Sequence, residues 1–227
     1  MPEETFAAEG QQATPTPDLV QSLERALDHK DLLLNEIQHR IRNSLSLVTS
    51  LLNLQASAAS EPAVRTALSD ASGRVLAVAR LHDRLHRLES LEQVRLDSCL
   101  ADIADGVEGQ AGRPAHIRLH HRLAPVLVAG RLAVPVGLIA NELLTNAYKY
   151  AFPDARKGEI HVALAQRGGR LLMVIADSGV GYPAGQRAGN GLGTRVTQAL
   201  AGQIGGRLRR LACGGCTQVL RFSSPRT

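Results

Sequence analysis

Residues 141–152 read NELLTNAYKYAF, and the spacing of their polar side chains guides the interpretation of the whole chain. Glu142, Asn146 and Lys149 follow one another at intervals of four and three residues, so a helix would carry all three on one face. An amide oxygen suits a hard cation such as Mg²⁺, an ammonium group attracts phosphate, and a carboxylate can orient water. The stretch predicts either a magnesium and phosphate site or an ordinary charged face of a surface helix.

Two glycine-rich segments follow, where the backbone could approach a ligand closely. Residues 176–183 read ADSGVGYP and end an apolar strand pattern, so Asp177 could accept a hydrogen bond from an exocyclic amine of a planar ligand. Residues 189–196 read GNGLGTRV and precede a predicted helix, whose first amide groups can bind phosphate oxygens. A dinucleotide-binding fold of the Rossmann type is excluded, because no strand leads directly into this second segment.

The N-terminal part of the chain contains two long helical patterns. Apolar residues at steps of three and four predict helices from Leu19 to Gln55 and from Pro62 to Glu89, which a short loop joins as an antiparallel hairpin. His39, in the segment EIQHRIRN, lies roughly 200° around the first helix from Ile37 and Ile41, on a polar face. A lone histidine of this kind is usually a solvated surface residue, so its interpretation depends on the rest of the chain.

Shorter patterns follow Ser90 and define a second region. Asp97 is predicted to cap a short helix. The other predicted elements are strands at 115–123, 124–129, 159–166, 170–177, 206–212 and 217–222, and helices at 132–151 and 192–204. Helices interleaved with strands that mostly pair as hairpins predict an α+β protein, in which a two-layer α/β sandwich with a mixed sheet follows the helical hairpin.

Taken in order, these motifs resemble the nucleotide-binding boxes of the Bergerat ATP-binding fold, which histidine kinases share with DNA gyrase. EIQHRIRNSLSLVTSLLNLQA resembles the phosphoacceptor helix of the HWE-related group of bacterial sensor histidine kinases, and RVLAVARLHDRLHRLES resembles its second helix. The resemblance covers about residues 28–225. With it we predict a disordered leader (1–18), a dimerisation and phosphotransfer hairpin (19–90) and a catalytic ATP-binding domain (91–227).

The resemblance also implies roles for individual residues. It makes His39 the phosphoacceptor, Asn146 the magnesium ligand, Asp177 the adenine-binding residue and Lys149 a phosphate contact. Glu142 stands where many classical histidine kinases have a histidine. Further nucleotide contacts are implied for Tyr150, Gly179, Gly181, Gly189, Gly191, Leu192, Gly193 and Thr217, the last through a water to Asp177.

Two polar neighbours of His39 on its helix have chemistry that suits phosphoryl transfer. Glu36, one turn earlier, could hold the other ring nitrogen and fix the tautomer. Asn43, one turn later, could position a water or the phosphoryl group. The chain departs from the group at several points, and among them the tryptophan for which the HWE branch is named is missing.

The resemblance implies a histidine protein kinase of two-component signalling that uses Mg-ATP and passes its phosphoryl group to the aspartate of a response-regulator receiver domain. The apolar stripes of the hairpin predict a homodimer, because a pair of helices seldom covers both stripes. Two alternatives stay open. One is a histidine phosphotransfer adaptor with a vestigial nucleotide domain, and the other is a Bergerat-fold ATPase or serine kinase.

Composition restricts the remaining classes of protein. The net charge of +5 invites a nucleic-acid partner, but the basic residues are spread along the chain and only three Phe and three Tyr could stack on bases. No apolar run reaches the length of a membrane span, and the acidic N-terminus lacks a signal-peptide core. Three cysteines argue against a disulfide framework. We therefore predict a cytoplasmic chain with neither a nucleic-acid partner nor a membrane segment.

Overall fold

The computed structural model describes residues 17–86, 93–181, 192–212 and 214–223. Its internal contacts divide the chain into two units, 1–41 and 42–227, which are described separately. The boundary falls inside the first helix, so the second half of that helix belongs to the larger unit. The predicted boundary near residue 90 stays a prediction.

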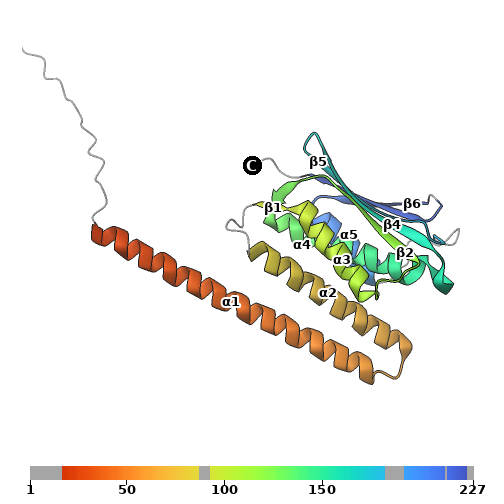
Figure 1. Cartoon of the computed structure of the whole chain (residues 1–227), viewed down its shortest axis with the longest axis horizontal. Helices are drawn as coiled ribbons and strands as arrows, with labels where there is room; N and C mark the ends of the chain where they lie inside the picture. Colours follow the sequence, from red (N-terminus) through yellow and green to blue (C-terminus); the bar gives the residue numbers. More distant parts are fainter. Residues whose placement is uncertain (1–16, 87–92, 182–191, 213, 224–227) are drawn as a thin grey trace, which may run out of the picture. The chain divides into compact units, whose positions relative to one another are not determined.

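The two long helices form as the apolar periodicity predicts (Figure 1). Helix α1 spans Pro17–Ala58 and helix α2 spans Pro62–His86. Proline suits the first helical position because it has no N–H to leave unpaired there. Helix α1 therefore starts two residues before the predicted Leu19, and the rest of the predicted leader lies outside the described residues. Within the larger unit, Leu45 and Thr49 of α1 face Leu76 of α2 across a groove.

A five-stranded mixed sheet forms the centre of the larger unit, with strand order β2-β4-β5-β7-β6. Strand β2 pairs with β4 in parallel, and the other neighbours are antiparallel, as predicted for a mixed sheet. The strands are β2 (Ile117–Leu123), β4 (Gly158–Arg167), β5 (Arg170–Asp177), β6 (Arg207–Ala212) and β7 (Cys216–Ser223). Strands β1 (Gln93–Arg95) and β3 (Leu127–Ala129) form a separate antiparallel pair, so the predicted strand at 124–129 is shorter and lies outside the main sheet.

Three helices lie on one side of this sheet and make the second layer (Figure 1). They are α3 (Leu96–Gln110), α4 (Gly130–Asn146) and α5 (Leu192–Gln203). Fully buried Leu100, Ile139 and Leu144 of the helices belong to one hydrophobic core with Ile160 and Leu220 of the strands. Burying each such side chain contributes about 1.5–3 kcal/mol, so this core fixes α4 firmly against the sheet.

The start of α3 differs from the prediction. Arg95, and not Asp97, occupies the position before the first helical residue, and no side chain caps the helix there. The Asp97 carboxylate instead accepts the Val126 N–H at 3.2 Å and pairs with Arg95 at 2.7 Å. It therefore ties the helix start to the chain that leads into β3.

The predicted helix at 132–151 has a break that the sequence pattern does not reveal. Helix α4 ends at Asn146, and a wider π-helical turn spans Ala147–Ala151. Such turns are rare and occur frequently at functional sites. Lys149 lies within this turn and still lines the same cavity as Glu142 and Asn146.

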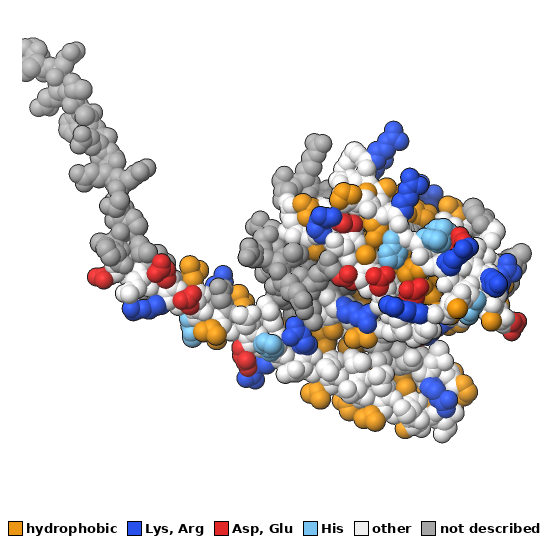
Figure 2. Space-filling view, in the orientation of Figure 1, with side chains coloured by type: hydrophobic (Ala, Val, Ile, Leu, Met, Phe, Trp, Pro, Cys, Tyr) orange, Lys and Arg blue, Asp and Glu red, His pale blue; other side chains and the backbone are white. Residues whose placement is uncertain are grey.

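No described element covers the other side of the sheet, and this open face is strongly basic. Side chains alternate between the two faces of a strand, and the exposed face carries one acidic strand residue, Glu159. Its exposed arginines are Arg118, Arg122, Arg167, Arg170, Arg207, Arg209 and Arg221. Figure 2 shows basic side chains standing out over the strands. The fold thus gathers arginines that are scattered along the sequence.

Candidate functional site

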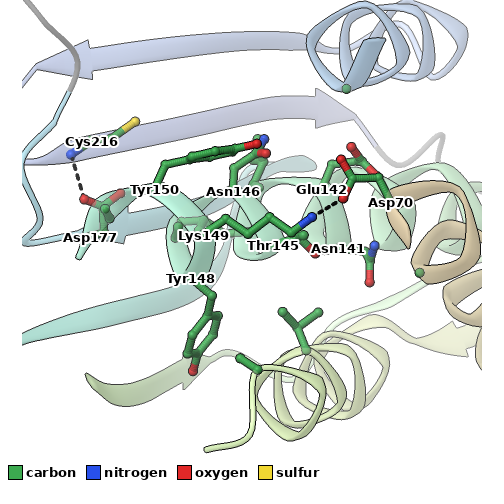
Figure 3. A pocket seen from close by; sticks show the side chains of 18 of the residues that line it. Asp70, Asn141, Glu142, Thr145, Asn146, Tyr148, Lys149, Tyr150, Asp177 and Cys216 are labelled. Carbon is green, nitrogen blue, oxygen red and sulfur yellow. Dashed lines mark hydrogen bonds and ion pairs between the residues drawn. The ribbon is translucent and has the colours of Figure 1, made fainter. Parts of the chain in front are cut away.

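A cavity of about 920 Å³ opens between α2, the end of α4, the π turn and the inner face of β5 and β7 (Figure 3). Its volume lies within the usual range for small-molecule sites. Eight predicted site residues lie in or beside it: Glu142, Asn146, Lys149, Tyr150, Asp177, Gly179, Gly181 and Gly193. Gly189, Gly191 and the side chain of Leu192 are outside the described residues. The fold therefore brings together three motifs that lie far apart in the sequence.

Asp177 ends strand β5 at one end of this cavity. Its Oδ1 accepts the N–H of Gly179 at 3.0 Å and the N–H of Cys216 at 3.2 Å. Burial raises the pKa of the Asp177 carboxyl, and the two backbone donors partly oppose that rise. Both bonds use Oδ1, so Oδ2 is left to accept a donor from a ligand.

Thr217 does not support Asp177 as the prediction assumed. Cys216 is the cross-strand partner of Asp177, while Thr217 pairs with Ala176. Because successive side chains of a strand point to opposite faces, Thr217 lies on the open face of the sheet and does not line the cavity. The backbone N–H of Cys216 supplies the contact directly, which corrects the predicted role of Thr217.

The loop after Asp177 packs closely on the π turn. The Val180 N–H donates to the Ala151 carbonyl at 2.9 Å. A Cβ at Gly179 would lie 2.2 Å from the same carbonyl oxygen, which no other residue could accommodate. Gly181 has a φ of 66°, a conformation that glycine adopts readily. The two glycines therefore hold the loop against the wall of the cavity.

Glu142 is the most buried charged residue of the site. Its two carboxylate oxygens accept from Arg74 of α2, with Nε at 2.5 Å and Nη2 at 2.9 Å. The hydrogen bonds that Arg74 donates to Glu142 raise the pKa of the Arg74 guanidinium, so this group stays charged. A Cβ at Gly193 would lie 2.7 Å from Oε2 of Glu142. Helix α2, helix α4 and the start of α5 thus meet at this carboxylate.

Lys149 is also engaged by α2. Its Nζ forms an ion pair with the carboxylate of Asp70, one turn before Arg74 (Figure 3). Tyr150 is exposed at the rim of the cavity, whereas Tyr148 points toward α3, where its hydroxyl lies 3.5 Å from Glu108. Burial raises the pKa of the Tyr148 hydroxyl, which therefore stays protonated.

Asp70 and Arg74 are functional candidates that the sequence interpretation missed. The second helix was interpreted through its apolar stripe, and its polar residues have no local motif. The available signal was their spacing of four residues, which places an acid and a base on one face of α2. On that face, Asp70 meets the positive charge of Lys149, and Arg74 meets the negative charge of Glu142.

The residues around His39 belong to α1. His39 and Asn43 are exposed, as expected for the polar face of that helix, while Ile41 is partly buried. The Glu36 carboxylate accepts from Arg40 Nε at 2.8 Å, and both side chains are exposed. Such an exposed pair contributes only about 0.3–0.5 kcal/mol, so Arg40 holds Glu36 weakly. The predicted contact between Glu36 and His39 stays a prediction.

The donor atoms of the cavity suit a magnesium ion that a phosphate ligand helps to hold. No group of three or more His, Cys, Asp or Glu residues that could bind a metal occurs among the described residues. Asn146 contributes a carboxamide to the cavity. Mg²⁺ commonly takes only one or two protein ligands and completes its shell with phosphate oxygens and water. A single amide oxygen therefore fits a magnesium ion whose other ligands are phosphate oxygens and water.

Comparisons with protein families identify two consecutive regions of this chain. Residues 36–109 match the family described as histidine kinase, and residues 113–208 match the histidine kinase-like ATPase domain. None of the helices in the described part of the chain has both the length and the hydropathy of a membrane span.

Curated relatives and a solved structure agree with these families. Sensor histidine kinase PdtaS of Mycobacterium tuberculosis is 32% identical over 80% of this chain and 36% of the relative, and PdtaS of Mycolicibacterium smegmatis is 34% identical over 89% and 42%. The chain therefore spans about two fifths of these relatives. The histidine kinase domain of the Erythrobacter litoralis blue-light activated histidine kinase is 26% identical, with a TM-score of 0.64 over 88% of this chain and 94% of that domain.

Proposed function

We propose, since the chain belongs to the histidine kinases, that it phosphorylates itself on His39 with Mg-ATP and then passes the phosphoryl group to a receiver-domain aspartate of a response regulator. The observation that carries this proposal is the single cavity that collects Asp177, Asn146 and Lys149 in the ATPase region. An exposed histidine lies in the preceding region, which matches the histidine kinase family.

The cavity can orient ATP from its two ends. The free Oδ2 of Asp177 would accept the exocyclic amine of adenine. Lys149 and the first amide groups of α5, near Gly193, would hold the phosphates, because helix N-termini attract anions. The Asn146 oxygen would hold the Mg²⁺ ion, which neutralises phosphate charge when it is bound.

The proposed chemical step forms one bond and breaks one. The lone pair of a neutral ring nitrogen of His39 attacks the γ-phosphorus, and the bond between this phosphorus and the bridging oxygen breaks as ADP leaves. The other ring nitrogen then loses its proton to a carboxylate, for which Glu36 and Glu142 are the candidates. Asn43 would position the transferring group.

Incubation with radiolabelled Mg-ATP tests the proposal. The expected label is lost in acid and stable in alkali, as for phosphohistidine, and His39→Gln abolishes it without changing nucleotide binding. His29→Gln is the matched control, because His29 is an exposed histidine on the same helix. Labelling that persists in His39→Gln would contradict the assignment, and label that withstands acid would favour the serine kinase alternative.

The adaptor alternative predicts a different result. An adaptor with a vestigial nucleotide domain would accept phosphate on His39 from another phosphoprotein and would bind no ATP. Calorimetry with Mg-ATP separates the two cases before any labelling is attempted.

We also propose that the protein is a cytoplasmic homodimer through the hairpin. Leu47, Leu51 and Leu54 of α1 each leave more than half of their surface exposed. A second hairpin would cover them in a four-helix bundle. Light scattering over a range of concentrations should give twice the 24.2 kDa chain mass, and a constant mass of one chain would reject the dimer.

Cys99 and Cys216 are buried free thiols, which fits the reducing compartment that a cytoplasmic location implies.

A further inference from the structure

Two ion pairs join α2 to the cavity, and α2 supplies the acidic residue of one pair and the basic residue of the other. On α2, Asp70 and Arg74 lie one helical turn apart, and they bind Lys149 and Glu142 respectively. Each pair joins one residue of α2 to one residue of the NELLTNAYKYAF stretch. Asp70 and Arg74, the charged residues of α2 that line the cavity, are therefore both neutralised by a partner of opposite charge.

The two pairs differ in how readily they exchange partners. The Arg74 and Glu142 side chains are only 19% and 8% exposed and are joined by two hydrogen bonds. Separating them would leave a buried charge without a partner, which is strongly unfavourable. Lys149 and Asp70 are 34% and 26% exposed and share one contact. Solvent screens this second pair, so another anion can replace Asp70 at little cost.

We propose that Asp70 competes with the phosphates of the nucleotide for Lys149, and so sets the affinity of the site for ATP. This inference rests on the proposed nucleotide function of the cavity. The carboxylate of Asp70 occupies the position on the Lys149 ammonium group that a phosphate oxygen would take. A polyphosphate carries more negative charge than one carboxylate, so it displaces Asp70 and leaves that carboxylate facing a like charge.

This exchange connects nucleotide loading with the helical hairpin. When Lys149 turns to the phosphates, α2 loses one of its two ionic contacts with the cavity and keeps the Arg74–Glu142 pair as a pivot. Arg74 is then a positioning residue, because it holds the Glu142 carboxylate in place beside Gly193. Helix α2 follows directly on the helix that carries His39, so occupancy of the cavity changes how firmly the hairpin is held.

Isothermal calorimetry on the full chain tests the inference with Mg-ATP and with adenosine as probes. Asp70→Asn keeps the shape of the side chain and removes its charge, and we expect Mg-ATP to bind roughly fivefold tighter, with adenosine unaffected. Glu61→Gln is the matched control, because it removes an exposed acidic charge just before the same helix and should leave both affinities unchanged. In a Lys149→Met background, Asp70→Asn should have no effect on Mg-ATP binding.

The outcomes separate this inference from the proposed function. If the parent protein binds no nucleotide, the nucleotide assignment of the cavity fails, and the inference fails with it. If the parent binds Mg-ATP but Asp70→Asn binds it equally well, only the competition by Asp70 is overturned. Weaker binding by Asp70→Asn would also overturn it, and would indicate that Asp70 contacts the magnesium ion.

Discussion

Replacing Asp177 by asparagine should separate the ligand role of this residue from its role in the fold. An asparagine can place its carboxamide oxygen where Oδ1 lies and accept the same N–H groups of Gly179 and Cys216, now at 3.0 and 3.2 Å. Its NH₂ group would then replace Oδ2 and face the exocyclic amine of adenine, donor against donor. The folded structure should tolerate this change, whereas the bound nucleotide should not.

The size of each effect follows from these contacts. A hydrogen bond to a charged acceptor contributes about 1.5–3 kcal/mol, so its loss should weaken the binding of ATP and ADP alike by roughly 10- to 150-fold. The free energy of unfolding should change by less than about 0.5 kcal/mol, because both backbone donors keep an acceptor. Asp177→Ala leaves the two N–H groups unpaired, and should lower the free energy of unfolding by roughly 2–6 kcal/mol, at about 1–3 kcal/mol for each group.

Calorimetry with ATP and ADP, together with urea unfolding, measures both quantities on the same samples. Parental affinity in Asp177→Asn would show that adenine does not bind at this end of the cavity. Equal destabilisation by asparagine and alanine would show that the two backbone hydrogen bonds do not depend on Oδ1 in the way described.

Three further predictions concern other parts of the same unit. Asn146→Ala should weaken ATP binding in the presence of Mg²⁺ and leave the magnesium-free affinity unchanged, which calorimetry with and without the ion measures. Gly193→Ala should destabilise the fold by about 1–3 kcal/mol in urea, because its Cβ would lie 2.7 Å from a carboxylate that Arg74 holds in place, and unchanged stability would refute that close contact. The ion pair with Arg95 lowers the pKa of Asp97 to about 2, from 3.8 in the unfolded chain, so its stabilising contribution is complete above about pH 4 and is lost as the pH falls towards 2. In acid titrations, Asp97→Asn should flatten this part of the stability curve.

Features set by neighbouring residues could be predicted from the sequence, and features set by distant contacts could not. The periodicity around Leu45 predicted a helix, because one buried face imposes its period on the local pattern, and the short apolar run in RLLMVIAD predicted a strand. The π turn was missed because AYKYA fits an α-helix equally well, and its contact with the loop at Gly179 lies far along the sequence.

The candidate site shows the same division. Asp177, Asn146 and Lys149 stand in recognisable motifs, so their meeting in one cavity could be anticipated. The role of the charged face of α2 could not be anticipated, because the partner of Asp70 is Lys149, 79 positions later in the sequence. The error at Thr217 was avoidable, since counting the alternation of β7 from its first residue places that side chain on the opposite face of the sheet.

The arginine-lined open face of the sheet has a consequence for handling the molecule. A cation-exchange matrix or a carboxylated sensor surface should adsorb the protein through this face, because positive charge is concentrated there and is hardly offset by acidic side chains. The helices lie on the opposite side of the sheet, and the cavity opens among them. Immobilised molecules would therefore share one orientation, with their cavities turned towards the flowing solution, and raising the salt concentration should release them.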